Sequence, residues 1–270
     1  MRTLVVGAAG KTGSRVAGRL REQGREVVAA SRSLTGFDWY EPDTHDDALS
    51  GVDSAYLVAP VGDPDPVGVM GPFLERAARQ GVRRIVLLSV APAESGGPGL
   101  GRVHALVPTL FAEWAVLRPT WFMQNLVGAH PHARSIADRG ELITATGDAR
   151  VALIDVDDIA DVAVRALTGP PPNTDWLLTG PEAVSYTDVA AVISEVTGVP
   201  LRHRAVEPEE LRAYLETFLP AAAAARMAGL DRIIASGSQE RVTGVVEEVT
   251  GRPARTLWDW AVRHRSQLPA

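Results

Sequence analysis

The sequence predicts an α/β fold, in which a Rossmann-type doubly wound parallel sheet is followed by a smaller, mostly helical C-terminal domain. Short apolar runs alternate with amphipathic segments, and a glycine-rich loop directly follows the first run. From about Pro181 the strand patterns fade and helical patterns dominate. We therefore expect a Rossmann domain over residues 1–180 and a helical, substrate-covering domain over 181–270, with contributions from about 119–135.

Five apolar runs are typical of buried parallel strands: residues 3–6, 27–30, 55–59, 85–90 and 114–117. Two further runs, 142–145 and 176–178, are candidates to extend the same sheet. Amphipathic segments over 14–23, 43–50 and 70–80 predict helices between the strands. In the C-terminal part, the capping-box spacing of two pairs predicts helix starts, at Ser185 with Asp188 and at Thr256 with Asp259.

The composition of the 270-residue chain limits the classes of function. A net charge of -6 argues against nucleic acid as the main partner and against an anionic membrane surface. The absence of cysteine excludes disulfides, thiol catalysis and zinc–thiolate sites. No apolar run approaches the ~18 residues of a membrane span, and the first run is too short for a signal peptide. We expect a cytoplasmic protein that acts on a small molecule.

The loop GAAGKTG, residues 7–13, contains two phosphate-binding signals. Its GKT triplet matches the end of a nucleoside-triphosphate P-loop, whereas its three glycines match a dinucleotide fingerprint. A P-loop needs a further glycine five positions before the one that precedes the lysine, and Val5 of the first strand occupies that position. The P-loop interpretation therefore fails.

In the dinucleotide interpretation, each of the three glycines has a distinct structural role. Gly7 makes the tight turn, Gly10 lets the backbone approach a pyrophosphate, and Gly13 lets the following helix pack closely. The strand before the loop and the helix after it strengthen this interpretation. The remaining loop residues expected to contact the cofactor are Ala9, Lys11 and Thr12.

The end of the second strand indicates which dinucleotide binds. An NAD-selective site usually carries Asp or Glu about 20 residues past the glycines, where it binds the ribose 2′-hydroxyl. Here Ser31 and Arg32 stand instead, and a guanidinium can grip a 2′-phosphate, which favours NADP(H). The alternative is that Arg32 is a solvated loop residue. Asp38, after an expected third strand, either binds the adenine amine or caps a turn.

Several motifs together resemble the NmrA-like branch of the atypical short-chain dehydrogenase/reductases. Beside the glycine loop and Ser31-Arg32 they are FDW at 37–39, YLVAP at 56–60, LRPTWFMQN at 117–125, DVDDIADVAVRAL at 155–167 and GRPARTLWDWA at 251–261. Within that branch the chain is similar to the ergot-alkaloid-type dehydrogenases of secondary metabolism. The resemblance implies NADPH-dependent reduction of C=N or activated C=C bonds, and cofactor contacts from Ala59, Pro60 and Pro119.

One departure from the wider superfamily bears on the mechanism. Most short-chain dehydrogenases use Tyr-x-x-x-Lys to pass a proton to the substrate oxygen, but none of the four tyrosines has a lysine four positions later, and Lys11 is the only lysine. The resemblance places His104 at the histidine of a His-x-x-x-Glu motif, with Pro108 at the glutamate position. His104 is thus either a proton donor or a pocket-lining or surface histidine. Ser89 is either the superfamily's substrate-facing serine or a plain loop hydroxyl.

Other clusters have weaker support. An aromatic and polar stretch after the fifth strand either binds substrate beside the nicotinamide or forms core between domains; its residues are Trp121, Phe122, Met123 and Asn125. Four aspartates suggest a metal site, but they lack the pattern of a calcium loop and are expected as helix caps; they are Asp155, Asp157, Asp158 and Asp161. We expect no metal.

Two functions remain. The first is an NADPH-dependent oxidoreductase, such as an imine reductase, in which the protein positions cofactor and substrate and the cofactor supplies the chemistry. The second is a non-catalytic NADP(H)-sensing regulator that binds a protein partner. The apolar stretch after the fifth strand and the glycine-rich segment before His104 favour a small-molecule pocket, so we expect the enzyme.

Overall fold

The computed structural model describes residues 1–268 and divides into two compact units. Unit 1 contains residues 1–119, 156–178 and 245–252, and unit 2 contains residues 120–155, 179–244 and those described from Pro253 on. The chain therefore passes between the units several times. We expected residues 119–135 to contribute to the second domain; unit 2 also contains residues 136–155, and residues 245–252 belong to unit 1. Residues 245–252 belong to unit 1 because residues 245–250 form a helix that packs against the helix over residues 156–168.

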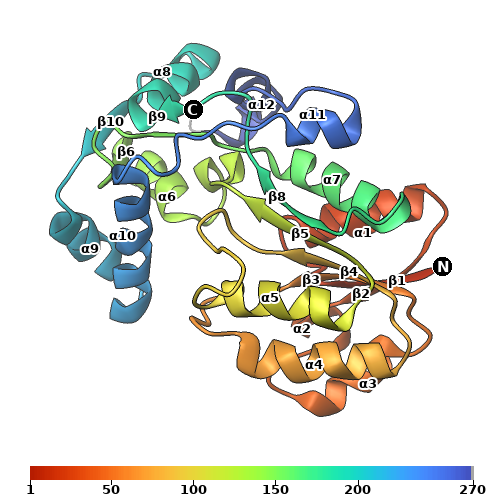
Figure 1. Ribbon diagram of the computed structural model, residues 1–270. Coiled ribbons are helices and arrows are strands. Elements are labelled where there is room, and N and C mark those ends of the chain that lie inside the picture. The colour runs from red at the N-terminus through yellow and green to blue at the C-terminus, as the bar shows by residue number, and fades with distance from the viewer. Residues whose placement is uncertain (269–270) are drawn as a thin grey trace. The chain divides into compact units, whose positions relative to one another are not determined.

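Unit 1 contains the expected Rossmann-type sheet, with six strands in the order β2-β1-β3-β4-β5-β8 (Figure 1). Every pair of neighbouring strands is parallel. The strands are β1 (Arg2–Val6), β2 (Glu26–Ala30), β3 (Ser54–Val58), β4 (Arg84–Leu88), β5 (Glu113–Pro119) and β8 (Thr174–Leu178). Chain direction across the sheet reverses between β1 and β3, which is where ligands bind in this class of fold.

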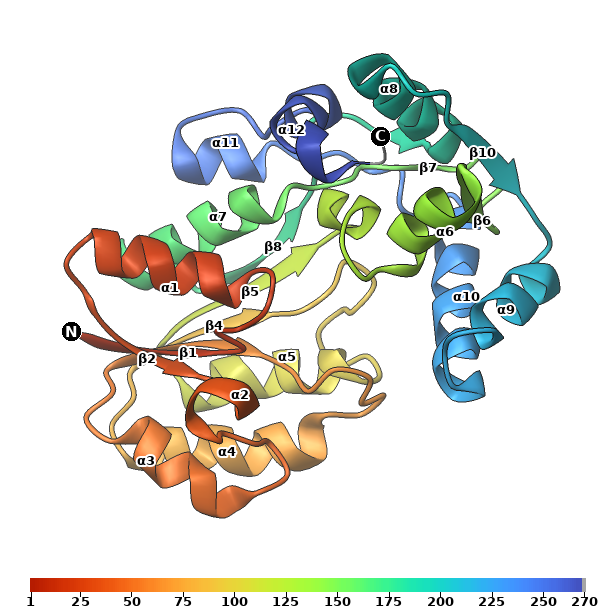
Figure 2. The same ribbon diagram turned by 180° about the vertical axis from the view of Figure 1, so that it is seen from behind.

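Helices cover both faces of this sheet (Figures 1 and 2). One face carries α1 (Gly13–Glu22), α7 (Val156–Thr168) and α11 (Val245–Thr250). The other face carries α3 (His45–Leu49), α4 (Val67–Arg79) and α5 (Leu100–Leu110), with the short α2 (Arg32–Thr35) and η1 (Pro42–Thr44) in the connection after β2. The larger apolar core of unit 1 lies under α4 and α5.

Two sequence expectations for the sheet are wrong. Residues 141–144 form a strand, β6, but it pairs in parallel with β10 (Arg202–Ala205) in a separate two-stranded sheet of unit 2. No strand precedes Asp38, because residues 36–38 form an irregular turn after α2. An apolar run indicates a buried strand, but it does not say which strand becomes its partner.

Unit 2 is mainly helical, as expected. Its elements are η2 (Met123–Leu126), α6 (Pro131–Arg139), β6 (Glu141–Thr144), β7 (Arg150–Val151), β9 (Val184–Ser185), α8 (Tyr186–Thr197), β10, α9 (Pro208–Glu216), α10 (Ala221–Ala235), α12 (Leu257–Arg263) and η3 (Arg265–Gln267). Both expected helix starts are confirmed. Ser185 forms a capping box with Asp188, and the Thr256 side chain accepts the N–H of Asp259 at the start of α12.

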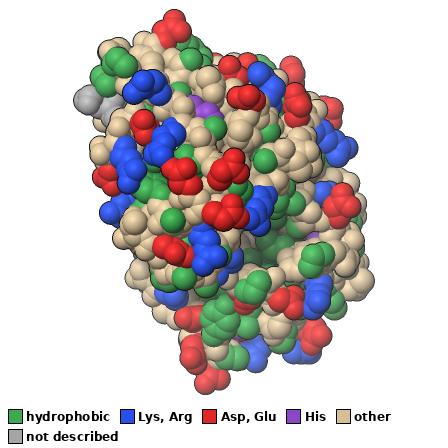
Figure 3. All heavy atoms as spheres, turned by 90° about the vertical axis from the view of Figure 1, so that its left-hand side faces the viewer, with side chains coloured by type: hydrophobic (Ala, Val, Ile, Leu, Met, Phe, Trp, Pro, Cys, Tyr) green, Lys and Arg blue, Asp and Glu red, His purple; other side chains and the backbone are tan. Residues whose placement is uncertain are grey.

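No helix among residues 1–268 is long and apolar enough to cross a membrane. On the face shown in Figure 3, acidic and basic side chains are interspersed, with hydrophobic side chains between them. The described residues on that face therefore form no continuous basic patch.

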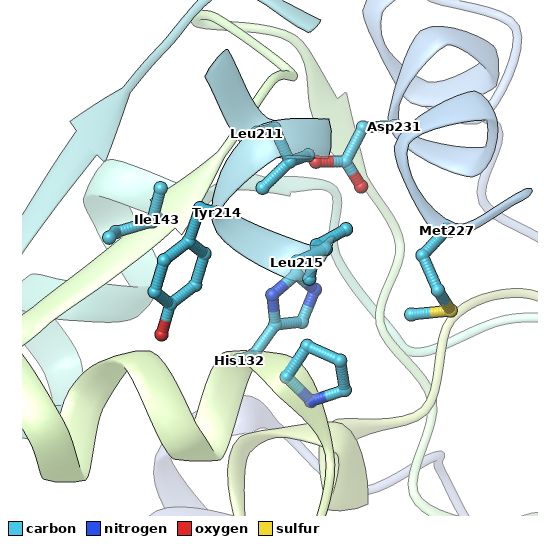
Figure 4. A pocket seen from close by; sticks show the side chains of 8 residues that line it. His132, Ile143, Leu211, Tyr214, Leu215, Met227 and Asp231 are labelled. Atoms are coloured by element: carbon cyan, nitrogen blue, oxygen red, sulfur yellow. The ribbon is translucent and has the colours of Figure 1, made fainter. Parts of the chain in front are cut away.

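A small cavity in unit 2 contains a buried carboxyl group (Figure 4). Asp231 of α10 is 4% exposed, and its Oδ2 accepts the N–H of Ala145 at 2.7 Å. Apolar side chains of β6, α9 and α10 surround the cavity, which has room for about one water molecule. Burial raises the pKa of Asp231 to about 6, because one backbone hydrogen bond does not replace the lost hydration.

This pKa predicts how stability depends on pH. Because the folded pKa of about 6 exceeds the ordinary value of 3.8, the folded state binds the extra proton, and the free energy of unfolding falls as pH rises from about 4 to above 6. Asp231→Asn keeps an acceptor for Ala145 but removes the charge. We expect its free energy of unfolding, relative to the unmodified protein, to gain up to about 3 kcal/mol between pH 4 and pH 8.

Chemical denaturation at both pH values measures this gain. Asp43→Asn, at an exposed position of η1, is the control and should show no such trend. A difference between Asp231→Asn and the unmodified protein that is equal at pH 4 and pH 8 would contradict the prediction.

Candidate cofactor and active site

The glycine loop joins β1 to α1 at the carboxyl edge of the sheet. Gly7 has a φ of 78°, in the left-handed region that favours glycine, and its carbonyl oxygen accepts the N–H of Gly10 at 2.8 Å. The N–H of Gly7 donates to the Ala30 carbonyl at 2.9 Å. Gly7 therefore makes the tight turn and joins the loop to the end of β2.

Gly13 and Gly10 have different steric surroundings. A Cβ atom on Gly13 would lie 2.2 Å from the carbonyl oxygen of Gly7, a separation that real Cβ atoms do not reach. A Cβ atom on the exposed Gly10 would lie 3.2 Å from the same oxygen, with no other neighbour within 4 Å. Gly13 is therefore required by the loop itself, whereas Gly10 leaves the outer side of the loop open.

Two side chains in the first turn of α1 donate hydrogen bonds to the backbone of the loop. Ser14 Oγ donates to the carbonyl of Gly10, and Arg15 Nη1 donates to the carbonyl of Lys11, both at 2.7 Å. Partial burial and the nearby Arg15 lower the pKa of Lys11. Thr12 is buried, and Ala9 is exposed beside Gly10. An open glycine turn at the N-terminus of a ten-residue helix fits a pyrophosphate.

Ser31 and Arg32 directly follow β2. Ser31 Oγ accepts the N–H of Leu34 at 3.2 Å and so caps α2. The exposed guanidinium of Arg32, the first residue of α2, makes no ion pair with a residue in 1–268. Because Ala30 is hydrogen-bonded to the glycine loop, Ser31 and Arg32 follow the strand end that contacts this loop.

Asp38 caps a turn that is anchored to the sheet. Its Oδ1 accepts the backbone N–H two residues later at 3.0 Å, and the indole of Trp39 donates to the Val58 carbonyl at 3.1 Å. This places the turn at the carboxyl end of β3. Two residues expected to contact the cofactor come next in the chain, Ala59 and Pro60.

Ser89 and His104 contribute buried polar atoms at the same edge. Ser89 follows β4 and is 2% exposed, and His104 lies on α5 and is 3% exposed. Within residues 1–268, neither Ser89 Oγ nor His104 Nδ1 has a hydrogen-bond partner. Burial lowers the pKa of His104, so its imidazole is mainly neutral near pH 7. A neutral imidazole can hold a hydrogen bond but is a weak source of protons.

Sequence reasoning missed Arg118 on β5. Its side chain is 15% exposed, Nη1 binds Asp175 Oδ2 of β8 at 2.8 Å, and Nη2 donates to the carbonyl of Ala91 at 2.8 Å. Its Nε is buried and has no partner in the described chain. The sequence does contain a signal that could have identified Arg118: it is a charged residue inside an apolar strand, directly before the expected cofactor contact Pro119.

The loops after β3 and β4 pack against each other at this edge. Arg102 Nη1 binds Asp65 Oδ2 at 2.8 Å, and a Cβ atom on Gly99 would lie 2.8 Å from the carbonyl oxygen of Pro64. The glycine-rich segment before α5 is therefore folded closely onto its neighbour.

The residues expected to bind substrate lie in unit 2, whereas Ser89 and His104 lie in unit 1. Phe122 forms a bridge with Ile154, and Met123 is 1% exposed within the apolar core of unit 2. Trp121 packs against that core and, like Asn125, is partly exposed. Their role in substrate binding stays a prediction.

The aspartates near the start of α7 form ion pairs with arginines. Arg19 binds both Asp157 and Asp161, each at 2.7 Å. Asp155, in unit 2, binds Arg263 at 3.0 Å. Residues 1–268 contain no group of three or more His, Cys, Asp or Glu placed to hold a metal ion.

Comparison with known proteins matches no family model but identifies similar proteins along nearly the whole chain. An uncharacterized oxidoreductase of Bacillus subtilis is 40% identical over 97% of this chain and 94% of that protein. Agroclavine dehydrogenase of Claviceps fusiformis is 35% identical over 96% of both chains. NAD(P)H azoreductase of Xenophilus azovorans is 32% identical over 99% of both.

Solved structures share the fold. The NADPH complex of a quinone oxidoreductase from Escherichia coli has a TM-score of 0.78 at 21% identity, over 97% of this chain and 99% of that one. NmrA, a negative transcriptional regulator in complex with NAD, has a TM-score of 0.76 at 14% identity, over 96% and 94%.

The steric difference between the glycines predicts separate effects on folding and on binding. Gly10→Val places a branched side chain on the open side of the loop, so we expect the protein to fold but to lose dinucleotide binding. Gly13→Ala forces its Cβ into the Gly7 carbonyl, so we expect a lower melting temperature. Circular dichroism melting and titration with NADPH by fluorescence measure both effects.

Gly18→Ala, at an open position of α1, is the matched control and should leave binding unchanged. If Gly10→Val bound NADPH as well as the unmodified protein does, the loop would not be the phosphate cradle.

Proposed function

The chain belongs to the NmrA-like atypical short-chain dehydrogenase/reductases, and we propose that it reduces a small molecule at a C=N or activated C=C bond. It is an NAD(P)H-dependent oxidoreductase, like its dehydrogenase and azoreductase relatives. The observation that carries the proposal is the burial of His104, which lowers its pKa, at the edge of the sheet that also holds the glycine loop. This edge offers hydrogen bonds to a substrate but no strong acid.

NADP(H) is the cofactor, as in the quinone oxidoreductase of the same fold. The glycine loop would hold its pyrophosphate, and Arg32 its 2′-phosphate, because that guanidinium is exposed and has no carboxylate partner in the described chain. When bound, the cofactor supplies a hydride. The protein's own task is then to orient the substrate and to exclude water.

Because the site has no strong acid, substrates that need prompt protonation suit it less well than substrates that do not. Reduction of a simple ketone leaves an alkoxide that needs prompt protonation, but the only lysine of the chain lies in the glycine loop, away from any tyrosine in sequence. An iminium ion already carries the charge that attracts hydride, and neutral His104 does not repel it. An activated alkene needs only a modest hydrogen-bond donor. Both classes therefore suit this site better than a simple ketone.

Cofactor choice tests the role of Arg32. We expect NADPH to bind more tightly than NADH, and Arg32→Ala to weaken NADPH binding about ten- to hundredfold while leaving NADH binding unchanged, because a charge-assisted hydrogen bond is lost. Fluorescence titration of both nucleotides measures this. Arg21→Ala, an exposed arginine at the far end of α1, is the control. Equal affinity of the unmodified protein for both nucleotides would exclude the assignment.

A substrate panel tests the reaction. Oxidation of NADPH is followed at 340 nm, the nicotinamide absorption band, with cyclic imines, cyclic enones and simple ketones. We expect imines or enones to be reduced faster than simple ketones. Because His104 is a weak source of protons, we expect only a modest loss of rate in His104→Ala. Turnover confined to ketones would refute the mechanism. Tight NADPH binding without turnover of any compound would instead indicate a cofactor-sensing regulator.

A further inference from the structure

The buried polar atoms of unit 1 that have no hydrogen-bond partner among residues 1–268 include three from β5, α5 and the residue that follows β4: Ser89 Oγ, His104 Nδ1 and Arg118 Nε. Buried polar atoms in native proteins are nearly always hydrogen-bonded, so each exception calls for a ligand or a water. Two of these atoms belong to residues that the sequence already marked as site candidates. The third belongs to Arg118, which has no role in the reaction described so far.

The sheet places Ser89 and Arg118 side by side. Leu88 pairs with Leu117 in the register of β4 and β5, and the N–H of Ser89 donates to the Leu117 carbonyl at 2.7 Å. The next pair in this register is Ser89 with Arg118. Two residues earlier, Leu87 and Val116 belong to the core under α5, and side chains of a strand alternate between faces. Ser89 and Arg118 therefore face α5.

His104 reaches the same place from α5. Its neighbour Val103, and Val107 one turn later, pack in the core with Val116 of β5. The helix α5, which carries His104, also packs against β5, the strand that carries Arg118. The three unpartnered atoms thus lie on one face of the sheet, at its carboxyl edge.

The orientation of Arg118 is set by its other nitrogens. Nη1 is held by Asp175 and Nη2 by the Ala91 carbonyl, each at 2.8 Å. Because a guanidinium is planar, these two bonds also set the direction of Nε–H. Asp175 balances the positive charge of Arg118. What Arg118 can offer to a ligand is therefore the N–H group at Nε, whose direction is fixed.

We propose that Arg118 Nε–H and Ser89 Oγ–H bind a carbonyl oxygen of the substrate, with His104 as an adjoining hydrogen-bond partner, so that the substrate is an α,β-unsaturated carbonyl compound. This inference rests on the proposed reductase function and selects the activated C=C bond over the iminium ion. The N–H of Arg118 and the O–H of Ser89 can both donate to an oxygen that gains negative charge, whereas an iminium nitrogen has no lone pair that could accept from them.

Hydride from NADPH forms the new C–H bond at the β-carbon, the C=C π electrons shift toward the carbonyl, and the oxygen becomes an enolate oxygen held by Arg118 and Ser89. The α-carbon then takes a proton from water, which restores C=O and leaves a saturated ketone, NADP⁺ and hydroxide. A guanidinium stays charged in proteins, so Arg118 stabilises the enolate without protonating it.

Arg118→Lys is the informative variant, because a lysine can still neutralise the charge of Asp175 but has no planar guanidinium and no Nε–H donor. We compare a panel of cyclic enones with an N-methyl-3,4-dihydroisoquinolinium salt as the preformed iminium ion. We expect kcat for enones to fall at least about tenfold, as when one donor to an oxyanion is removed, while kcat for the iminium salt and the Kd of NADPH stay unchanged. Ser89→Ala, which leaves the ion pair intact, should show the same selective loss.

Arg84→Lys is the matched control. Arg84 is also buried, at the opposite edge of the same sheet, and its loss should lower stability without changing the ratio of enone to iminium rates. An equal fall of both rates in Arg118→Lys, or no fall of either, overturns the proposal. A rise in the Kd of NADPH also overturns it, because the donor would then serve the cofactor's carboxamide. Turnover of the iminium salt but of no enone refutes this inference alone, whereas turnover of neither refutes the proposed function.

Discussion

Parallel pairing of all six strands in the large sheet is the constraint on which the site of unit 1 depends. Because every strand runs in the same direction, every strand ends at the same edge. Four of the predicted site residues directly follow the ends of adjacent strands, and a fifth ends the next strand: they are Gly7, Ser31, Ala59, Ser89 and Pro119. These residues are far apart in the chain, and only the hydrogen-bonded register brings them together.

Two arginines at opposite edges of this sheet differ in how fully their nitrogens are hydrogen-bonded. Arg84 lies at the amino edge, where Nε binds Glu113 and Nη1 donates to the carbonyls of Ala166, Leu167 and Gly169. Arg118 lies at the carboxyl edge and keeps a buried Nε without a partner in the described chain. A fully bonded arginine stabilises the fold, whereas the unpartnered Nε of Arg118 is the feature on which the proposed substrate contact depends.

Much of the fold was predictable because its signals are local. The apolar runs of β1 to β5 and the capping box at Ser185 are read from residues that are neighbours in sequence. Residues 141–144 were correctly identified as strand-forming, but their partner β10 lies some 60 positions later, and an apolar pattern carries no information on pairing. The interleaving of the two units was unpredictable for the same reason, since α11 joins unit 1 through contacts with α7.

The sequence by itself determined the glycine loop, the cation at Arg32 and the absence of a Tyr-x-x-x-Lys dyad, because these depend on residue type and spacing within short segments. It also pointed to Ser89 and His104, through their resemblance to family motifs. Only the tertiary structure decided that His104 is buried and neutral, and that Arg118 joins it with Asp175, 57 residues later, as counter-ion. Burial and long-range pairing arise when separate strands and helices pack, so no local pattern encodes them.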